Sequence, residues 1–161
     1  MPDDWKIVFR RLDYFFAFGL GSGLAPFGPG TFGSAVGLLL FIPLLYVPIE
    51  LQLTIIFLGF AFGVWVCDRV SKHMKVKDPS GIVWDEFVGI WITLLWLPSL
   101  SWLIPAFFLF RLFDIWKPWP VSVADRKVGG GLGIMFDDVI AGFLALGLLQ
   151  IIHFYSFDWL I

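Results

Sequence analysis

The amino-acid sequence predicts an all-α integral membrane protein, a small helical bundle of about four to five transmembrane helices with an N-terminal interfacial amphipathic helix. Three observations predict this class. Hydrophobic residues make up 59% of the 161-residue chain and charged residues only 15%, whereas soluble domains carry about a quarter charged residues. The mean hydropathy is +0.88. All lysines and arginines fall in three short stretches, which long apolar segments separate.

The basic residues orient the predicted bundle. They are Lys6, Arg10, Arg11, Arg69, Lys72, Lys75, Lys77, Arg111, Lys117, Arg126 and Lys127. Because loops rich in lysine and arginine stay in the cytoplasm, we expect the N-terminus and the loops at 68–81 and 117–133 to lie inside. The C-terminus is then expected outside. The net charge of −2 says little about partners, and we expect no nucleic acid and no obligatory protein partner.

The chain is predicted to be one domain, residues 1–161. Residues 1–18 mix bases with aromatic residues and are expected to lie in the interface. A glycine-rich loop is expected at 19–30 and the helical bundle at 31–155. The expected apolar segments are Thr31–Val47, Leu51–Cys67, Ile82–Leu97, Trp102–Trp116 and Ile134–Tyr155. Several are shorter than the roughly 20 residues that cross a bilayer, and the third and fourth are expected to form a tight hairpin.

Five carboxylates are predicted at cytoplasmic helix ends: Asp85, Glu86, Asp114, Asp137 and Asp138. Acids at the edge of membrane helices are costly unless they are paired, hydrated or metal-bound. All the candidate ligands are oxygen donors, which favour Mg²⁺ or Mn²⁺ over zinc. The alternative is helix capping, since acids are stabilised at helix N-termini. Neighbouring acids point about 100° apart on a helix, so the sequence does not assign which of each pair binds metal.

A phosphate site is predicted beside these acids. Gly30, Thr31, Gly33 and Ser34 end the glycine-rich stretch, where backbone N–H groups at a helix start attract anions. Thr31 is the predicted N-cap of this helix. Arg111 and Lys117 are the candidate side chains for holding phosphate, although Arg111 is also placed to neutralise Asp114. The alternative for the glycines is a re-entrant loop or close helix packing.

Three blocks of the sequence resemble the phosphatidylglycerophosphatase A family. They run from Gly21 to Ser34, from Asp78 to Gly89, and from Arg111 through Pro120 to Gly130–Gly142. The resemblance implies Mg²⁺-dependent hydrolysis of the membrane lipid phosphatidylglycerophosphate to phosphatidylglycerol and phosphate. It places this reaction at the cytoplasmic face of a bacterial inner membrane.

The expected catalytic residues are Asp85, Glu86, Asp138 and Lys117. Attack by water and a covalent aspartyl-phosphate route both remain open. Three other functions compete with the phosphatase: a small ion or proton transporter that uses the clustered carboxylates, a non-enzymatic scaffold, and a CDP-alcohol phosphotransferase. The last needs an Asp-Gly-x2-Ala-Arg run, which residues 138–142 lack.

Overall fold

The computed structural model describes residues 5–123 and 128–157, and these residues contain helices but no strands. The α-helices are α1 (Ile7–Arg10), α2 (Leu12–Ala17), α3 (Pro29–Phe41), α4 (Ile49–Met74), α5 (Trp84–Thr93), α6 (Leu103–Trp116) and α8 (Gly130–Phe157). Short 3-10 helices lie at Gly19–Leu24, Ile42–Tyr46 and Leu100–Trp102. The predicted all-α class is confirmed. Arg126 and Lys127, in the third basic stretch, lie outside the described residues.

Three helical stretches are long and apolar enough to cross a membrane: Pro29–Tyr46, Ile49–Met74 and Gly130–Ser156. They contain most of the first, second and fifth predicted segments. α5 and α6 have only 10 and 14 residues, which correspond to about 15 and 21 Å of helix against about 30 Å of hydrocarbon. They form the predicted hairpin, and each is shorter than a membrane-spanning helix.

α5 is the central helix of the bundle. It packs against α8, α3, α4 and α6, and all of its residues from Phe87 to Thr93 are buried. Its indole donors are paired across the bundle, since Trp84 Nε1 donates to Gly59 O at 2.9 Å and Trp91 Nε1 donates to Gly37 O at 2.8 Å. Because α5 is apolar on every face beyond its first turn, its two acids stand out at its N-terminal end.

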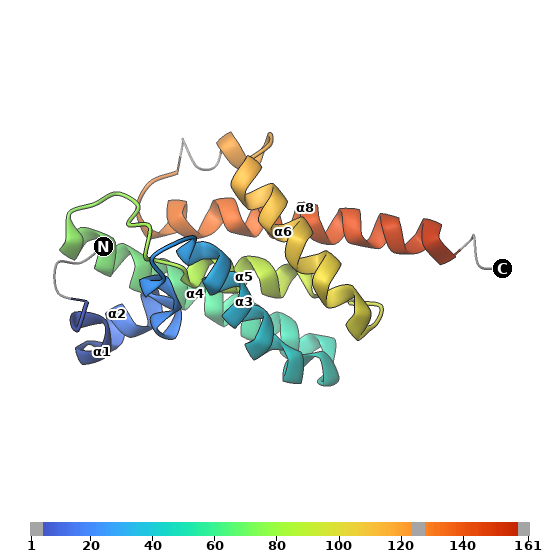
Figure 1. The fold of residues 1–161 in the computed structure, drawn as a ribbon, viewed down its shortest axis with the longest axis horizontal. Helices are drawn as coiled ribbons and strands as arrows, with labels where there is room; N and C mark the ends of the chain where they lie inside the picture. Colours follow the sequence, from blue (N-terminus) through green and yellow to red (C-terminus); the bar gives the residue numbers. More distant parts are fainter. Residues whose placement is uncertain (1–4, 124–127, 158–161) are drawn as a thin grey trace.

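The helix ends lie in two groups at opposite ends of the molecule. In Figure 1, α1, α2, the end of α4 and the start of α8 lie toward one end of the molecule. The turns between α3 and α4 and between α5 and α6 lie toward the other end. At the latter turn, Gln150 Nε2 of α8 donates to the backbone oxygen of Trp96 at 2.9 Å. α8 thus contacts the hairpin along its length.

The N-terminal helix differs from its prediction because it breaks at Arg11. This residue is extended, with φ −126° and ψ 124°, and separates α1 from α2. The break lets Arg11 contact Asp13 at 2.6 Å, and Arg69 of α4 contacts the same carboxylate at 3.0 Å. Tyr14 also reaches α4, with its hydroxyl 2.7 Å from His73 Nδ1. The N-terminal segment is therefore fixed to the end of α4.

The start of α3 corrects a second prediction. The N-cap is Gly28 rather than Thr31, and the helix begins at Pro29. Gly28 has φ +56°, a conformation that glycine adopts readily, and proline suits the first helical position because it has no N–H to satisfy. Within the expected glycine-rich loop, Gly19–Leu24 is a 3-10 segment interrupted by left-handed residues, Leu20 and Gly21.

Candidate active site

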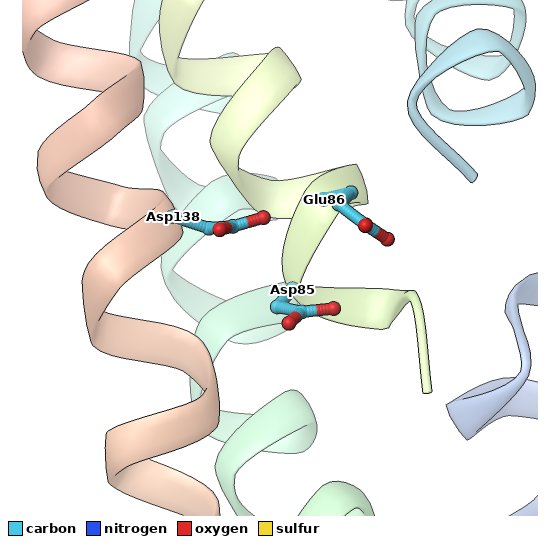
Figure 2. Close-up of side chains that lie close together, drawn as sticks. All are labelled: Asp85, Glu86 and Asp138. Atoms are coloured by element: carbon cyan, nitrogen blue, oxygen red, sulfur yellow. The ribbon is translucent and has the colours of Figure 1, made fainter. Parts of the chain in front are cut away.

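Three carboxylates from two helices meet at one end of the bundle. Asp85 and Glu86 lie in the first turn of α5, and Asp138 reaches toward them from α8, as Figure 2 shows. One oxygen of each side chain lies within 4.8 Å of the others. Asp138 is 3% exposed and the Glu86 side chain 12%. Such a group of buried acids has the ligand chemistry of a hard divalent cation.

Two glycines bring these helices together. A β-carbon at Gly142 of α8 would lie 2.5 Å from the backbone oxygen of Gly89 on α5. One at Gly89 would lie 2.9 Å from the backbone oxygen of Asp138. Thr93 strengthens the contact, since its hydroxyl lies 3.0 Å from Gly89 O and 3.3 Å from Gly142 O. Small residues permit this backbone approach, which positions Asp138 beside α5.

Each acid of the cluster keeps one buried oxygen without a hydrogen-bond partner. These atoms are Asp85 Oδ1, Glu86 Oε2 and Asp138 Oδ2. Buried polar atoms nearly always have a hydrogen-bond partner, so three carboxylate oxygens without one in the same place indicate a site that could bind a ligand. Carboxylates this close also repel one another, and a cation removes that repulsion. The donor set therefore fits Mg²⁺, which takes oxygen ligands.

Arg111 of α6 lies at the edge of the cluster. Its Nη1 atom is 2.5 Å from Asp114 Oδ2, 3.5 Å from Glu86 Oε1 and 3.3 Å from Ser34 Oγ. The Arg111 and Asp114 side chains are 12% and 13% exposed. Asp114, a predicted metal ligand, therefore forms an ion pair with Arg111. The sequence predicts this contact, because residues three apart share a face of a helix.

The glycines of α3 make room for Glu86. A β-carbon at Gly30 would collide with Glu86 Oε1, and one at Gly33 would lie 2.9 Å from Glu86 Oε2. Ser34 is buried, and its hydroxyl donates to Gly30 O at 2.9 Å. Thr31 is exposed, and its N–H donates to Gly28 O. Gly30, Gly33 and Ser34 thus line the Glu86 side of the site, whereas Thr31 is exposed.

Asp137 is separated from its neighbour Asp138. Its Oδ2 atom accepts from Lys117 Nζ at 2.8 Å, and its Oδ1 atom accepts from the Asp138 N–H at 3.1 Å. Lys117 follows α6 in a left-handed conformation, with φ +46°. The two adjacent acids therefore serve different partners, as their angular separation on a helix allows. Of the five predicted acids, Asp85, Glu86 and Asp138 form the cluster, while Asp114 and Asp137 form ion pairs.

Sequence reasoning missed one basic residue near the site. Lys77 lines a hollow beside Asp137, next to the start of α8. It belongs to a stretch with two other lysines, Lys72 and Lys75, and residue type and spacing do not distinguish it from them. The adjoining Asp78, which begins the second resemblance block, is the one signal in the sequence that points to this loop.

The fold and the site define an all-α membrane protein with a largely buried acidic site at one end of its helical bundle. The family model of Phosphatidylglycerophosphatase A matches residues 15–153. The chain belongs to this family and is a phosphatase. The resemblance noted in the sequence is thereby confirmed.

Curated relatives agree with the family match. The chain is 43% identical over 154 residues to Phosphatidylglycerophosphatase A of Escherichia coli, covering 94% of this chain and 85% of the relative. It is 43% identical over 144 residues to the protein of that name from Haemophilus influenzae, covering 88% of each. A Putative phosphatidylinositol-3-phosphatase of Bacteroides thetaiotaomicron is 37% identical over 143 residues, covering 83% of this chain and 88% of the relative. No solved structure matches the chain.

Proposed function

We propose that the protein is a Mg²⁺-dependent phosphatase that hydrolyses phosphatidylglycerophosphate to phosphatidylglycerol and phosphate. The similarity to relatives named phosphatidylglycerophosphatase A supports the reaction. One observation supports the metal above all others: Asp85, Glu86 and Asp138 each keep a buried, unpaired oxygen at the same place. These three side chains would hold the ion.

A bound divalent ion would polarise the phosphoryl oxygens and lower the pKa of an attacking water. Arg111 and Lys117 bring positive charge to the rim of the cluster, where they would hold the phosphate and stabilise charge in the transition state. A carboxylate of the cluster would accept the proton of the water. The water oxygen bonds to phosphorus, the bond from phosphorus to the glycerol oxygen breaks, and that oxygen takes up a proton.

The location of the reaction follows from charge. The end of α4 and the start of α8, which border basic stretches, lie toward one end of the molecule (Figure 1). Asp85 and Glu86 lie in the first turn of α5 and Asp138 in the first third of α8, and basic loops are retained in the cytoplasm. We therefore place the site at the cytoplasmic face of a bacterial inner membrane and the C-terminus on the other side. The lipid substrate comes from the bilayer itself, so the proposal requires no protein partner. A transport function would favour acids near the middle of the membrane, whereas these lie near helix ends.

The test is phosphate release from phosphatidylglycerophosphate by the full chain purified in detergent. EDTA should abolish the activity, and added Mg²⁺ should restore it. Asp138→Asn and Glu86→Gln should each lose about a hundredfold or more in kcat, because each removes a charged ligand. Glu50→Gln, an exposed acid at the start of α4, should keep full activity.

A second measurement separates folding from chemistry. A ligand that binds only the folded state raises its thermal midpoint. Mg²⁺ should therefore stabilise the wild type and the Glu50→Gln variant, but not Asp138→Asn. Full activity of both cluster variants, or activity that survives EDTA, would overturn the assignment of these residues to a metal site.

A further inference from the structure

A hollow of about 270 Å³ lies between the loop after α4 and the first turns of α8. Lys77 and Asp78 line it on the loop side, and Gly130, Gly133, Ile134 and Asp137 line it on the helix side. One lining residue, Asp137, directly precedes Asp138 of the acid cluster in the sequence. Lys77 and Asp78 take no part in the hydrolysis step proposed above.

The hollow is lined by exposed residues on its loop side and by Asp137, the sequence neighbour of the cluster residue Asp138, on its helix side. Gly130 begins α8, and Asp138 follows eight residues later, which is about 12 Å along a helix. Lys77 and Asp78 are exposed, whereas Asp137 is buried. A ligand in the hollow would therefore have one end at the surface and the other beside the cluster.

The lining combines acidic and basic groups. Asp78, Asp137 and Lys77 line the hollow, and Lys117 pairs with Asp137 at 2.8 Å. The charges of Asp78 and Asp137 are balanced by those of Lys77 and Lys117, so the lining has no excess positive charge to attract a bare phosphate dianion. Hydroxyl groups suit it better, because a hydroxyl donates to a carboxylate and accepts from an ammonium group. The lining therefore suits a ligand that carries a hydroxyl group and an anionic group.

We propose that this hollow binds the glycerol portion of the lipid headgroup and selects for it. This inference rests on the proposed phosphatase function. Asp78 accepts the hydrogen bond that the single free glycerol hydroxyl donates, and Lys77, at the exposed end, binds the phosphodiester that joins the glycerol to the lipid. The terminal phosphate then reaches the cluster. A lipid whose phosphomonoester is attached directly to diacylglycerol has neither group to offer the hollow.

The experiment compares phosphatidylglycerophosphate with phosphatidic acid of the same acyl chains, in mixed micelles, with the full chain. Lys77→Gln should raise KM for phosphatidylglycerophosphate about tenfold, the loss expected for one hydrogen bond to a charged group. Its kcat, and its KM for phosphatidic acid, should stay within about twofold of wild type. Asp78→Asn should shift the same selectivity ratio in the same direction.

The matched control is Lys75→Asn. Lys75 belongs to the same stretch but does not line the hollow, and asparagine tolerates its left-handed backbone, with φ +54°. This variant loses the same charge and should keep the wild-type selectivity. Wild-type selectivity in both Lys77→Gln and Asp78→Asn would overturn the proposal. Equal turnover of both lipids by the wild type would overturn it as well.

A binding measurement distinguishes this inference from the phosphatase function. Calorimetric titration of the wild type should show tighter binding of glycerol 3-phosphate than of inorganic phosphate, and Asp78→Asn should reduce that difference. If the wild type releases no phosphate from either lipid but still prefers glycerol 3-phosphate, the proposed reaction fails while the hollow stands. If the wild type binds the two ligands equally, the hollow has no role in headgroup selection.

Discussion

Replacing Gly142 with alanine should push α5 and α8 apart and disable the site without removing a polar group. The new β-carbon would lie 2.5 Å from the backbone oxygen of Gly89 and 3.2 Å from its carbonyl carbon. Ordinary contacts begin at 3.4 Å, so the backbones must separate by roughly 1 Å, the difference between 3.4 and 2.5 Å. Neither backbone can rotate away as a side chain would. Asp138, one turn before Gly142, would move with its helix.

The size of the effect follows from two opposing terms. Overpacking of this kind costs about 1–3 kcal/mol of folding stability, while alanine gains up to about 1 kcal/mol over glycine in a helix. Gly147→Ala on the same helix isolates the second term, because nothing lies within 4 Å of its β-carbon. Gly142→Ala should therefore be less stable than Gly147→Ala by about 1–3 kcal/mol. If Asp138 has the proposed role, its displacement by about 1 Å should also reduce activity up to a hundredfold.

The assay is denaturant unfolding in detergent together with phosphate release for both variants. Gly147→Ala should be as active as the wild type and at least as stable. If Gly142→Ala matches Gly147→Ala in stability and in activity, the glycine contact does not set the spacing of α5 and α8. The explanation given for the position of Asp138 would then be wrong.

Other regions of the molecule give further predictions. Arg111→Lys should lower kcat about tenfold or more although it keeps the charge, because a lysine ammonium group does not reproduce the position of the Arg111 Nη1 atom, which contacts both Asp114 and Glu86. An unchanged kcat would show that charge alone suffices. The arginines beside Asp13, mainly through a hydrogen bond from Arg11, lower its pKa from 3.8 to about 2. The stability it provides is therefore complete above about pH 4 and lost as the pH falls toward 2. Thermal unfolding between pH 5 and 2 should show this loss in the wild type and not in Asp13→Asn.

The fold class and the meeting of the main acids could be predicted from sequence because both depend on helix ends. Basic stretches predict which helix ends lie together, and Asp85, Glu86 and Asp138 all lie near such ends. Acids at neighbouring ends of one bundle come close whatever the details of packing. The contact of Arg111 with Asp114 could be predicted from helix periodicity, because residues three apart share a face of a helix.

The assignment of each acid to a partner could not be predicted, because it depends on how helices rotate against one another. Whether Asp137 or Asp138 faces the cluster is set by the rotation of α8, which the contact of Gly142 with Gly89 fixes. That contact joins positions 53 residues apart, and no local pattern reveals it. The break at Arg11 likewise reflects Arg69, a distant residue that shares Asp13 with it.

One helix holds both ends of the α5 segment. Near its start α8 places Asp138 against the acids of α5, and near its end Gln150 donates to the Trp96 carbonyl just beyond α5. A carbonyl left open in hydrocarbon is costly, so this amide also anchors the hairpin. A tilt of α8 would consequently act on both attachments at once. A change in bilayer thickness that tilted α8 would therefore also reach the acid cluster at the opposite end of the hairpin.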